Sequence, residues 1–145
     1  MPRPLFTIGY EGKTVDEVLA ALAEAQVDLL IDVRAVAASR RPGFSKTALA
    51  GALAEHGIGY LHLRALGTPK AGREAARKGR VAEMRAIFEE QLETPEAEAA
   101  MARAVDEAGE RRTALLCFER EAGGCHRSMV AERMMERSQL ERVDL

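Results

Sequence analysis

The sequence lacks the features that mark several specialised classes of protein. Its 145 residues include only two cysteines, Cys117 and Cys125, and so few cannot form the disulfide framework of a small secreted domain. No apolar run is long enough to cross a membrane, and no apolar signal-peptide core lies near the first residues. These absences predict a cytoplasmic protein with reduced thiols and no membrane partner.

An excess of charge of either sign is also missing. The formal net charge is −2, which excludes a general attraction to nucleic acid or to acidic membranes. Hydrophobic residues make up 47% and charged residues 30% of the chain, a composition typical of folded rather than disordered proteins. With no repeat, low-complexity tract or linker, the length predicts a single domain over residues 1–145.

Apolar runs alternate with amphipathic segments along the chain. The runs predict strands at Leu5–Tyr10, Asp28–Arg34, Ile58–Leu63 and Thr113–Glu119, and a short final strand at Val143–Leu145. Helical spacing predicts helices after the caps Thr14, Ser45 and Thr94, through Val81–Leu92, and at His126–Arg137. Gly67–Gly72 is predicted as a loop, and only helices are expected between Arg73 and Gly109.

This order of elements predicts the fold class. Strands that alternate with helices favour a three-layer α/β domain with a mostly parallel sheet of four to five strands. The near-continuous apolarity of Asp28–Arg34 is typical of a strand buried on both faces. A helical insertion precedes the last main strand, and the order of strands in the sheet stays open.

Ionisable residues gather where the predicted strands end, which is where ligands bind in such sheets. The three strand ends carry Tyr10 and Glu11, Asp32 and Arg34, and Cys117 and Glu119. Alternation along a strand places Asp32 on the same face as Arg34, and Cys117 on the same face as Glu119. The first pair has two interpretations of similar weight: an acid–base and anion-binding pair, or a salt bridge at a strand end.

A basic loop follows the second strand. Arg34, Arg40, Arg41 and Lys46 surround Pro42–Phe44, and arginine forks of this kind suit the oxyanions of a phosphate. Composition alone favours a solvated basic loop. The position of the loop directly after a strand end favours a phosphate clamp.

The string Cys125-His126-Arg127-Ser128 follows two glycines and opens the last helix. It would place backbone N–H groups, a guanidinium and a hydroxyl around one anion-sized space, and a helix start also lowers the pKa of a thiol. The alternatives are structural: Ser128 as a helix cap, His126 as a stacking residue, and Cys117 as a small buried apolar residue.

Four residues at this end of the chain are of types that bind zinc: Cys117, Glu119, Cys125 and His126. Their spacing matches no zinc finger or zinc ribbon. No metal and no cofactor is therefore predicted, and metal binding is kept as a minor alternative.

Taken together, the motifs resemble a known family. They are Thr7-Ile-Gly9, Asp32-Val-Arg34, Ser39-Arg40 with Pro42-Gly-Phe44, Gly57-Ile58 with Tyr60, Leu66-Gly67, Cys117-Phe-Glu119 and Cys125-His-Arg-Ser128. The chain is similar, over about Leu5 to Glu132, to the bacterial and archaeal family of domain of unknown function 488. The resemblance implies a compact α/β domain whose motifs converge on one pocket, with no assigned activity. Many relatives carry a His-Ser-type pair where this chain has Tyr10-Glu11.

A weaker resemblance is to rhodanese-like sulfurtransferases, which have an Asp-x-Arg strand end and a cysteine loop before an Arg-Ser helix start. Their loop places five residues between cysteine and arginine. Here nine residues separate Cys117 from Arg127, and Cys125 lies only two positions before Arg127. The rhodanese-like chemistry is therefore kept only as an alternative.

The main functional hypothesis is a pocket for an anionic ligand that carries phosphate, such as a nucleotide or a nucleic-acid end. The ligand-binding residues expected are Tyr10, Glu11, Arg34, Arg40, Arg41, Arg127 and Ser128, with Asp32 and Glu119 as acid–base groups. The first alternative is a cysteine-dependent enzyme that uses Cys125, or less favourably Cys117, with His126. The second is a non-enzymatic binding or regulatory module. Whether the protein is an enzyme, and its oligomeric state, stay open.

Overall fold

The computed structural model describes residues 2–121 and 125–145. Its strands are β1 (Arg3–Gly9), β2 (Leu29–Asp32), β3 (Gly59–His62), β4 (Thr113–Cys117) and β5 (Leu140–Asp144). Its helices are α1 (Val15–Glu24), α2 (Lys46–Glu55), α3 (Lys70–Arg77), α4 (Val81–Leu92), α5 (Pro95–Glu110) and α6 (His126–Arg137), with a short 3₁₀ helix, η1 (Arg64–Leu66). Among the described residues, no helix combines the length and apolar character needed to cross a membrane.

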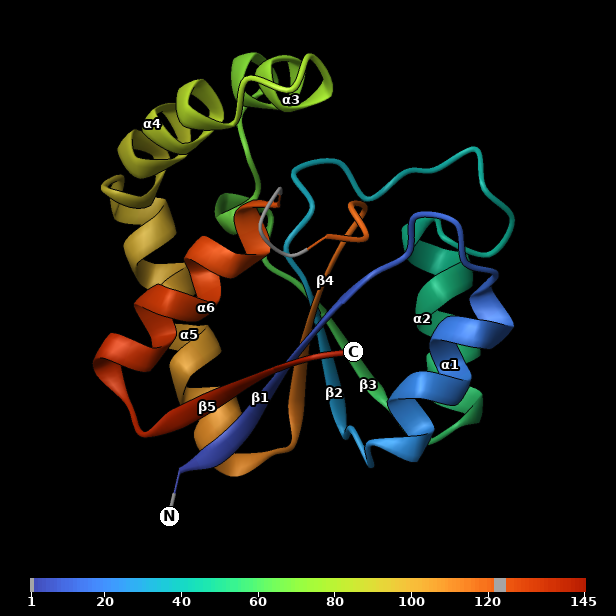
Figure 1. Ribbon diagram of the computed structural model, residues 1–145. Helices are drawn as coiled ribbons and strands as arrows, with labels where there is room; N and C mark the ends of the chain where they lie inside the picture. The colour runs from blue at the N-terminus through green and yellow to red at the C-terminus, as the bar shows by residue number, and fades with distance from the viewer. Residues whose placement is uncertain (1, 122–124) are drawn as a thin grey trace.

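All five strands of the sheet run parallel, in the order β3-β2-β4-β1-β5 (Figure 1). Strand β4 comes late in the sequence, but in the sheet it lies between β1 and β2. The register pairs Cys117 with Gly9 on one side, and Leu116 with Asp32 on the other. The carboxyl ends of three strands therefore lie side by side, although they come from distant parts of the chain.

Helices cover both faces of the sheet, which confirms the three-layer α/β class (Figure 1). Residues that alternate along β2 separate the core into two clusters: Ile31 packs on the α3–α6 side with Phe88, and Leu30 on the α1–α2 side with Leu22. Complete burial of one such side chain contributes about 1.5–3 kcal/mol. A strand covered on both faces is apolar at nearly every position, as the sequence of β2 indicated.

The helix starts follow local sequence signals closely. The Thr14 hydroxyl accepts a hydrogen bond from the Glu17 amide, and the Glu17 carboxylate accepts one from the Thr14 amide, so the predicted capping box is confirmed. Thr94 caps α5, with Pro95 in its first turn. Ser45 differs, because its hydroxyl bonds to the backbone of Ser39 rather than to the start of α2.

Helix α3 corrects the predicted loop at Gly67–Gly72. Pro69 and Gly72 favour a loop, but a helix forms from Lys70 and buries Ala75 in the core. Gly72 also faces Thr68 so closely that a Cβ atom would lie 2.4 Å from the Thr68 methyl group. The insertion therefore contains three helices where the apolar spacing indicated two.

Candidate functional site

A cavity of about 130 Å³ opens at the carboxyl ends of the strands. Its wall includes Tyr10 after β1, Arg34 after β2, Cys117 and Glu119 at the end of β4, Arg73 from α3 and His126 from α6. Tyr10, Val36, Met84 and Phe118 add apolar surface. An apolar hollow with a few converging polar groups is the usual form of a small-molecule site. The predicted Gly123–Gly124 turn lies outside the described residues.

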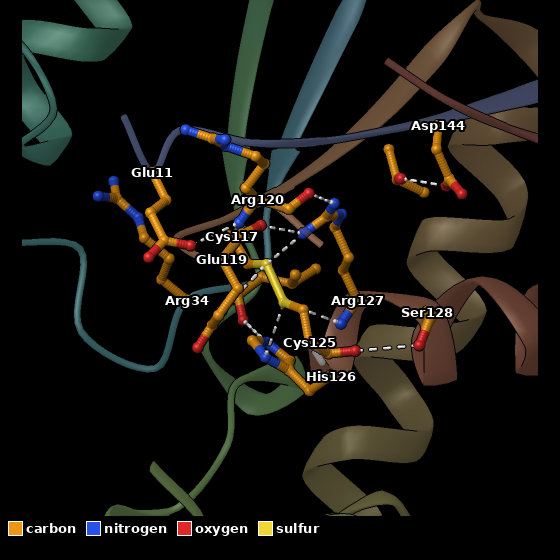
Figure 2. The surroundings of a disulfide bond; sticks show 12 residues. Glu11, Arg34, Cys117, Glu119, Arg120, Cys125, His126, Arg127, Ser128 and Asp144 are labelled. Atoms are coloured by element: carbon orange, nitrogen blue, oxygen red, sulfur yellow. Dashed lines mark hydrogen bonds between the residues drawn. A yellow bond between two sulfur atoms is a disulfide. The ribbon is translucent and has the colours of Figure 1, made fainter. Parts of the chain in front are cut away.

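The two cysteines meet beside this cavity. Cys117 is the last residue of β4 and Cys125 is the N-cap of α6; a disulfide joins them, with Cα atoms 7.4 Å apart (Figure 2). Both side chains are buried, and Cys117 lines the cavity. The prediction of reduced thiols is therefore corrected. The reason is tertiary: α6 starts directly beside the end of β4, so eight positions of sequence separation become one contact.

Polar groups surround both sulfur atoms (Figure 2). The Arg127 guanidinium Nη1 lies 3.0 Å from Cys117 Sγ, and the Arg127 backbone N–H donates to Cys125 Sγ at 3.5 Å. A Glu119 carboxylate oxygen lies 3.5 Å from Cys117 Sγ, on the strand face that the sequence indicated. A cation and a helix start beside the sulfurs favour the thiolate forms when the pair is reduced.

His126 lies beneath the sulfur atoms in a single tautomer. Its Nε2 is 2.7 Å from the Val33 carbonyl oxygen, which only accepts hydrogen bonds, so we assign the ring proton to Nε2. The lone pair of Nδ1 then points to Cys125 Sγ, 3.7 Å away. Burial lowers the pKa of His126 to about 4, so the imidazole is neutral at pH 7.

Burial shifts the pKa of Glu119 in the opposite direction from that of His126. Burial raises the pKa of its carboxyl group, and hydrogen bonding to its own backbone and the charge of Arg127 offset only part of that increase. Glu119 thus presents a carboxyl group of raised proton affinity to the cavity, beside the sulfur of Cys117.

Arg127 is buried, with 1% of its surface exposed, and it holds the backbone that follows β4. Nη1 donates to the Glu119 carbonyl and Nη2 to the Arg120 carbonyl, whereas Nε has no partner among the described residues. Burial lowers its pKa, and the nearby charges of Asp144 and Glu119 act against that change. Its Nη atoms are therefore already engaged by the protein.

Gly9 explains why the first motif ends in glycine. A Cβ atom at this position would lie 1.7 Å from the Glu119 carbonyl oxygen and 2.9 Å from Arg127 Nη1. The backbone after β4 crosses the end of β1 at this point. Only a residue without a side chain leaves room for that crossing.

Asp32 and Arg34 form a buried ion pair on the α1–α2 side of the sheet. The guanidinium donates to both Asp32 carboxylate oxygens at 2.7–3.0 Å, and to Tyr10 Oη and the Phe44 carbonyl. Burial alone would lower the pKa of Arg34, but the hydrogen bonds and charge of Asp32 raise it. Tyr60 donates its hydroxyl to Asp32 at 2.6 Å, and burial together with that carboxylate raises its pKa.

The other predicted ligand-binding residues lie outside the wall of the cavity. Arg40 and Glu11 are exposed. Arg41 donates to the Tyr10 and Lys13 carbonyls, and the Ser128 hydroxyl donates to the Cys125 carbonyl. The structure thus brings five predicted residues to the cavity, namely Tyr10, Arg34, Cys117, Glu119 and His126.

Arg73 is a cavity residue that sequence reasoning missed. It is half-buried, and its Nη1 donates to the Thr68 carbonyl at 2.9 Å. The sequence placed it at the start of a helical layer that covers the sheet. The only local signal was an arginine next to a Gly- and Pro-containing segment, and that signal does not indicate which way the side chain points.

The fold and site together define a class: a three-layer α/β domain that carries a cysteine pair at the carboxyl edge of its parallel sheet. Residues 14–134 match the family described as domain of unknown function DUF488, and the chain belongs to this family. The resemblance found in the motifs is therefore confirmed. No curated protein and no solved structure shows significant similarity to the chain.

Proposed function

We propose that the protein carries out thiol–disulfide exchange, with Cys117 and Cys125 cycling between the dithiol and the disulfide. The observation that carries the proposal is the position of the pair: its sulfurs are joined, and Cys117 lines the cavity together with residues that follow β1 and β2 and with the start of α6. Because Cys117 is fully buried, the proposal requires the cavity wall to open when a small disulfide or thiol reaches that sulfur.

In the reducing direction the Cys117 thiolate attacks one sulfur of a substrate disulfide. A bond forms between these two sulfurs, the substrate S–S bond breaks, and the departing thiolate takes up a proton. Cys125 then attacks Cys117, and its thiol proton passes to the second substrate sulfur as that sulfur leaves. The protein disulfide forms and the second substrate thiol leaves, so two electrons pass from the pair to the substrate.

The two cysteines have different roles in this proposal. The sequence favoured Cys125 as the nucleophile because it opens a helix. The geometry favours Cys117, since it lines the cavity and has the Arg127 guanidinium 3.0 Å from its sulfur. Cys125, at the N-cap of α6, is the resolving thiol.

The test uses the reduced protein and an aromatic disulfide reagent, with the coloured thiol product followed against pH. We expect a reactive thiol with a midpoint clearly below the free-cysteine value of ~8.5. Cys117→Ser should abolish the fast phase, and Cys125→Ser should trap the mixed disulfide on Cys117, which mass spectrometry detects. Arg127→Gln removes the cation beside Cys117 and should raise the midpoint, whereas Arg133→Gln, on the same helix but away from the sulfurs, is the matched control. A midpoint near ~8.5 in the unaltered protein contradicts the proposal.

A second candidate function is supported by a different observation. Beside the cavity lies a hollow of about 330 Å³ whose wall includes Arg64, Lys70 and Arg73. Arg73 lines both spaces. Such a cationic rim suits a small anionic ligand, including a phosphate-bearing nucleotide. The guanidinium groups of Arg34 and Arg127 already donate hydrogen bonds to the protein itself. This second candidate therefore places anion binding on the cationic residues of the hollow instead.

Calorimetric titration with phosphate and with common nucleotides tests this second function. We expect Arg73→Gln to reduce affinity at least tenfold, whereas Arg77→Gln, at an exposed position on the same helix, should leave it unchanged. Equal affinity for the two variants, or no heat from any of these ligands, removes this candidate.

A further inference from the structure

We propose that the reduced protein binds one Zn²⁺ ion through Cys117, Cys125 and His126, with Glu119 as the fourth ligand. The inference goes beyond disulfide exchange, because it requires only that the two cysteines reach the dithiol state.

The four donor atoms already lie close enough to hold one ion. The two sulfurs, one ring nitrogen of His126 and a Glu119 carboxylate oxygen are all within 4.8 Å of one another. A tetrahedral zinc site with ordinary bond lengths separates its ligand atoms by roughly 3.3–3.8 Å. The distance from Cys125 Sγ to His126 Nδ1 is 3.7 Å, and that from Cys117 Sγ to Glu119 Oε2 is 3.5 Å. Breaking the sulfur–sulfur bond allows the distance between the two sulfurs to increase to that of a zinc site.

The groups around these four residues also fit a metal site. A ligating histidine usually donates its second ring N–H to a carbonyl or carboxylate, and His126 does so to the Val33 carbonyl, which leaves Nδ1 free to bind. Arg127 supplies N–H groups to both sulfurs, as thiolate ligands require. The cysteines are at most 1% exposed and His126 is 8% exposed, so water is largely excluded.

The donor set selects the metal. Two thiolates and an imidazole are soft or borderline ligands that prefer zinc to magnesium or calcium. Zn²⁺ with two thiolates and one carboxylate carries a net charge of about −1, and the adjacent Arg127 cation balances it. The sequence kept these four residues only as a minor metal-binding alternative, because their spacing matches no zinc motif: Cys117 and Glu119 come from a strand end, and Cys125 and His126 from a helix start.

The chemistry balances with a named reductant. A phosphine and one water convert the disulfide to two thiols and a phosphine oxide, and Zn²⁺ then displaces the two thiol protons with no change of its own oxidation state. The two cysteines therefore cannot form the disulfide and bind zinc at the same time.

Titration of the reduced protein with Co²⁺ under anaerobic conditions provides a spectroscopic test. We expect one Co²⁺ per chain, with a thiolate-to-cobalt charge-transfer band and the visible bands of tetrahedral cobalt, and stoichiometric displacement by Zn²⁺. Thiol counting in denaturant verifies that both cysteines are reduced. If the native protein resists reduction, it is reduced unfolded and refolded with Zn²⁺, and bound zinc is then measured by elemental analysis.

Variants assign the ligands. Cys117→Ser and Cys125→Ser should each weaken the charge-transfer band and lower the zinc affinity more than 100-fold. His126→Ala should lower the zinc affinity at least tenfold, and Glu119→Gln should lower it less than that. His56→Gln, an exposed histidine at the end of α2, is the matched control and should bind as the unaltered protein does.

Two outcomes overturn the proposal: reduced protein that binds no metal, and cobalt binding that persists in both serine variants. The result is separate from that for exchange. Zinc binding without disulfide exchange contradicts only the proposed function, and exchange without metal binding contradicts only this inference.

Discussion

Charged side chains near the cavity are buried, and their pairing decides what a substitution there costs in stability. Asp32 has no exposed surface and Arg34 only 6%, and the Arg34 guanidinium donates hydrogen bonds to both Asp32 carboxylate oxygens. Removal of one member of such a pair leaves an isolated charge in the interior, which is far more costly than the loss of an exposed ion pair. The sequence left this pair open between a binding role and a salt bridge. In the structure the carboxylate is enclosed by Arg34 and Tyr60, as a structural salt bridge requires.

We therefore expect Asp32→Ala to lower the free energy of unfolding by about 3–5 kcal/mol in urea titrations. The control is Glu98→Ala, which removes the exposed ion pair with Arg137 and should cost less than ~1 kcal/mol. The double variant Asp32→Ala, Arg34→Met should recover part of the loss, because no unpaired charge remains. Similar costs for Asp32→Ala and Glu98→Ala would show that the burial of the pair has no energetic weight.

At the scale of elements, local signals determine where helices start, and tertiary contacts determine which segments come close. The capping box was predicted from Thr14 and Glu17, three residues apart, and the Thr94 cap from Pro95 beside it, since the partners are neighbours in the sequence. Helix α3 was not predicted, because Pro69 and Gly72 indicated a loop, although the Ala, Lys, Arg and Glu residues of the segment favour a helix. The close crossing at Gly9 depends on a segment more than a hundred residues away.

The crossing at Gly9 leads to a prediction about β1. Gly9→Ala should destabilise the protein by about 3 kcal/mol or more, since the new methyl group meets the Glu119 backbone rather than a movable side-chain end. Gly51→Ala is the opposite case: nothing lies within 4 Å of its Cβ position, and alanine in a helix should stabilise by about 0.5–1 kcal/mol. Thermal unfolding of the two variants checks both signs. An unchanged melting temperature for Gly9→Ala would contradict the crossing.

For the molecule as a whole, the buried histidine couples folding to pH. Burial holds the pKa of His126 at about 4 in the native state, against 6.5 in the unfolded chain. Between these values the unfolded chain binds more protons at this group, so the free energy of unfolding rises with pH across the window and falls as pH approaches 4. The whole contribution is up to about 3 kcal/mol.

Urea unfolding of the oxidised protein at several pH values between 4 and 7.5, with chelator present, tests this coupling. The fall in stability toward pH 4 should be clearly smaller in His126→Gln, whose amide can still donate to Val33. Glu119 acts with the opposite sign because its pKa is raised, and it is present in both proteins, so the comparison isolates His126. Parallel pH profiles for the two proteins would contradict the prediction.

By itself the sequence determined the α/β class, most element boundaries and the family, because apolar periodicity, caps and motifs are properties of neighbouring residues. Only the tertiary structure decided the strand order, the pairing of Cys117 with Cys125 and the place of Arg73 in the cavity. The physical reason is the insertion of β4 between β1 and β2. That step brings the ends of three strands and the start of α6 together, and no local pattern specifies it.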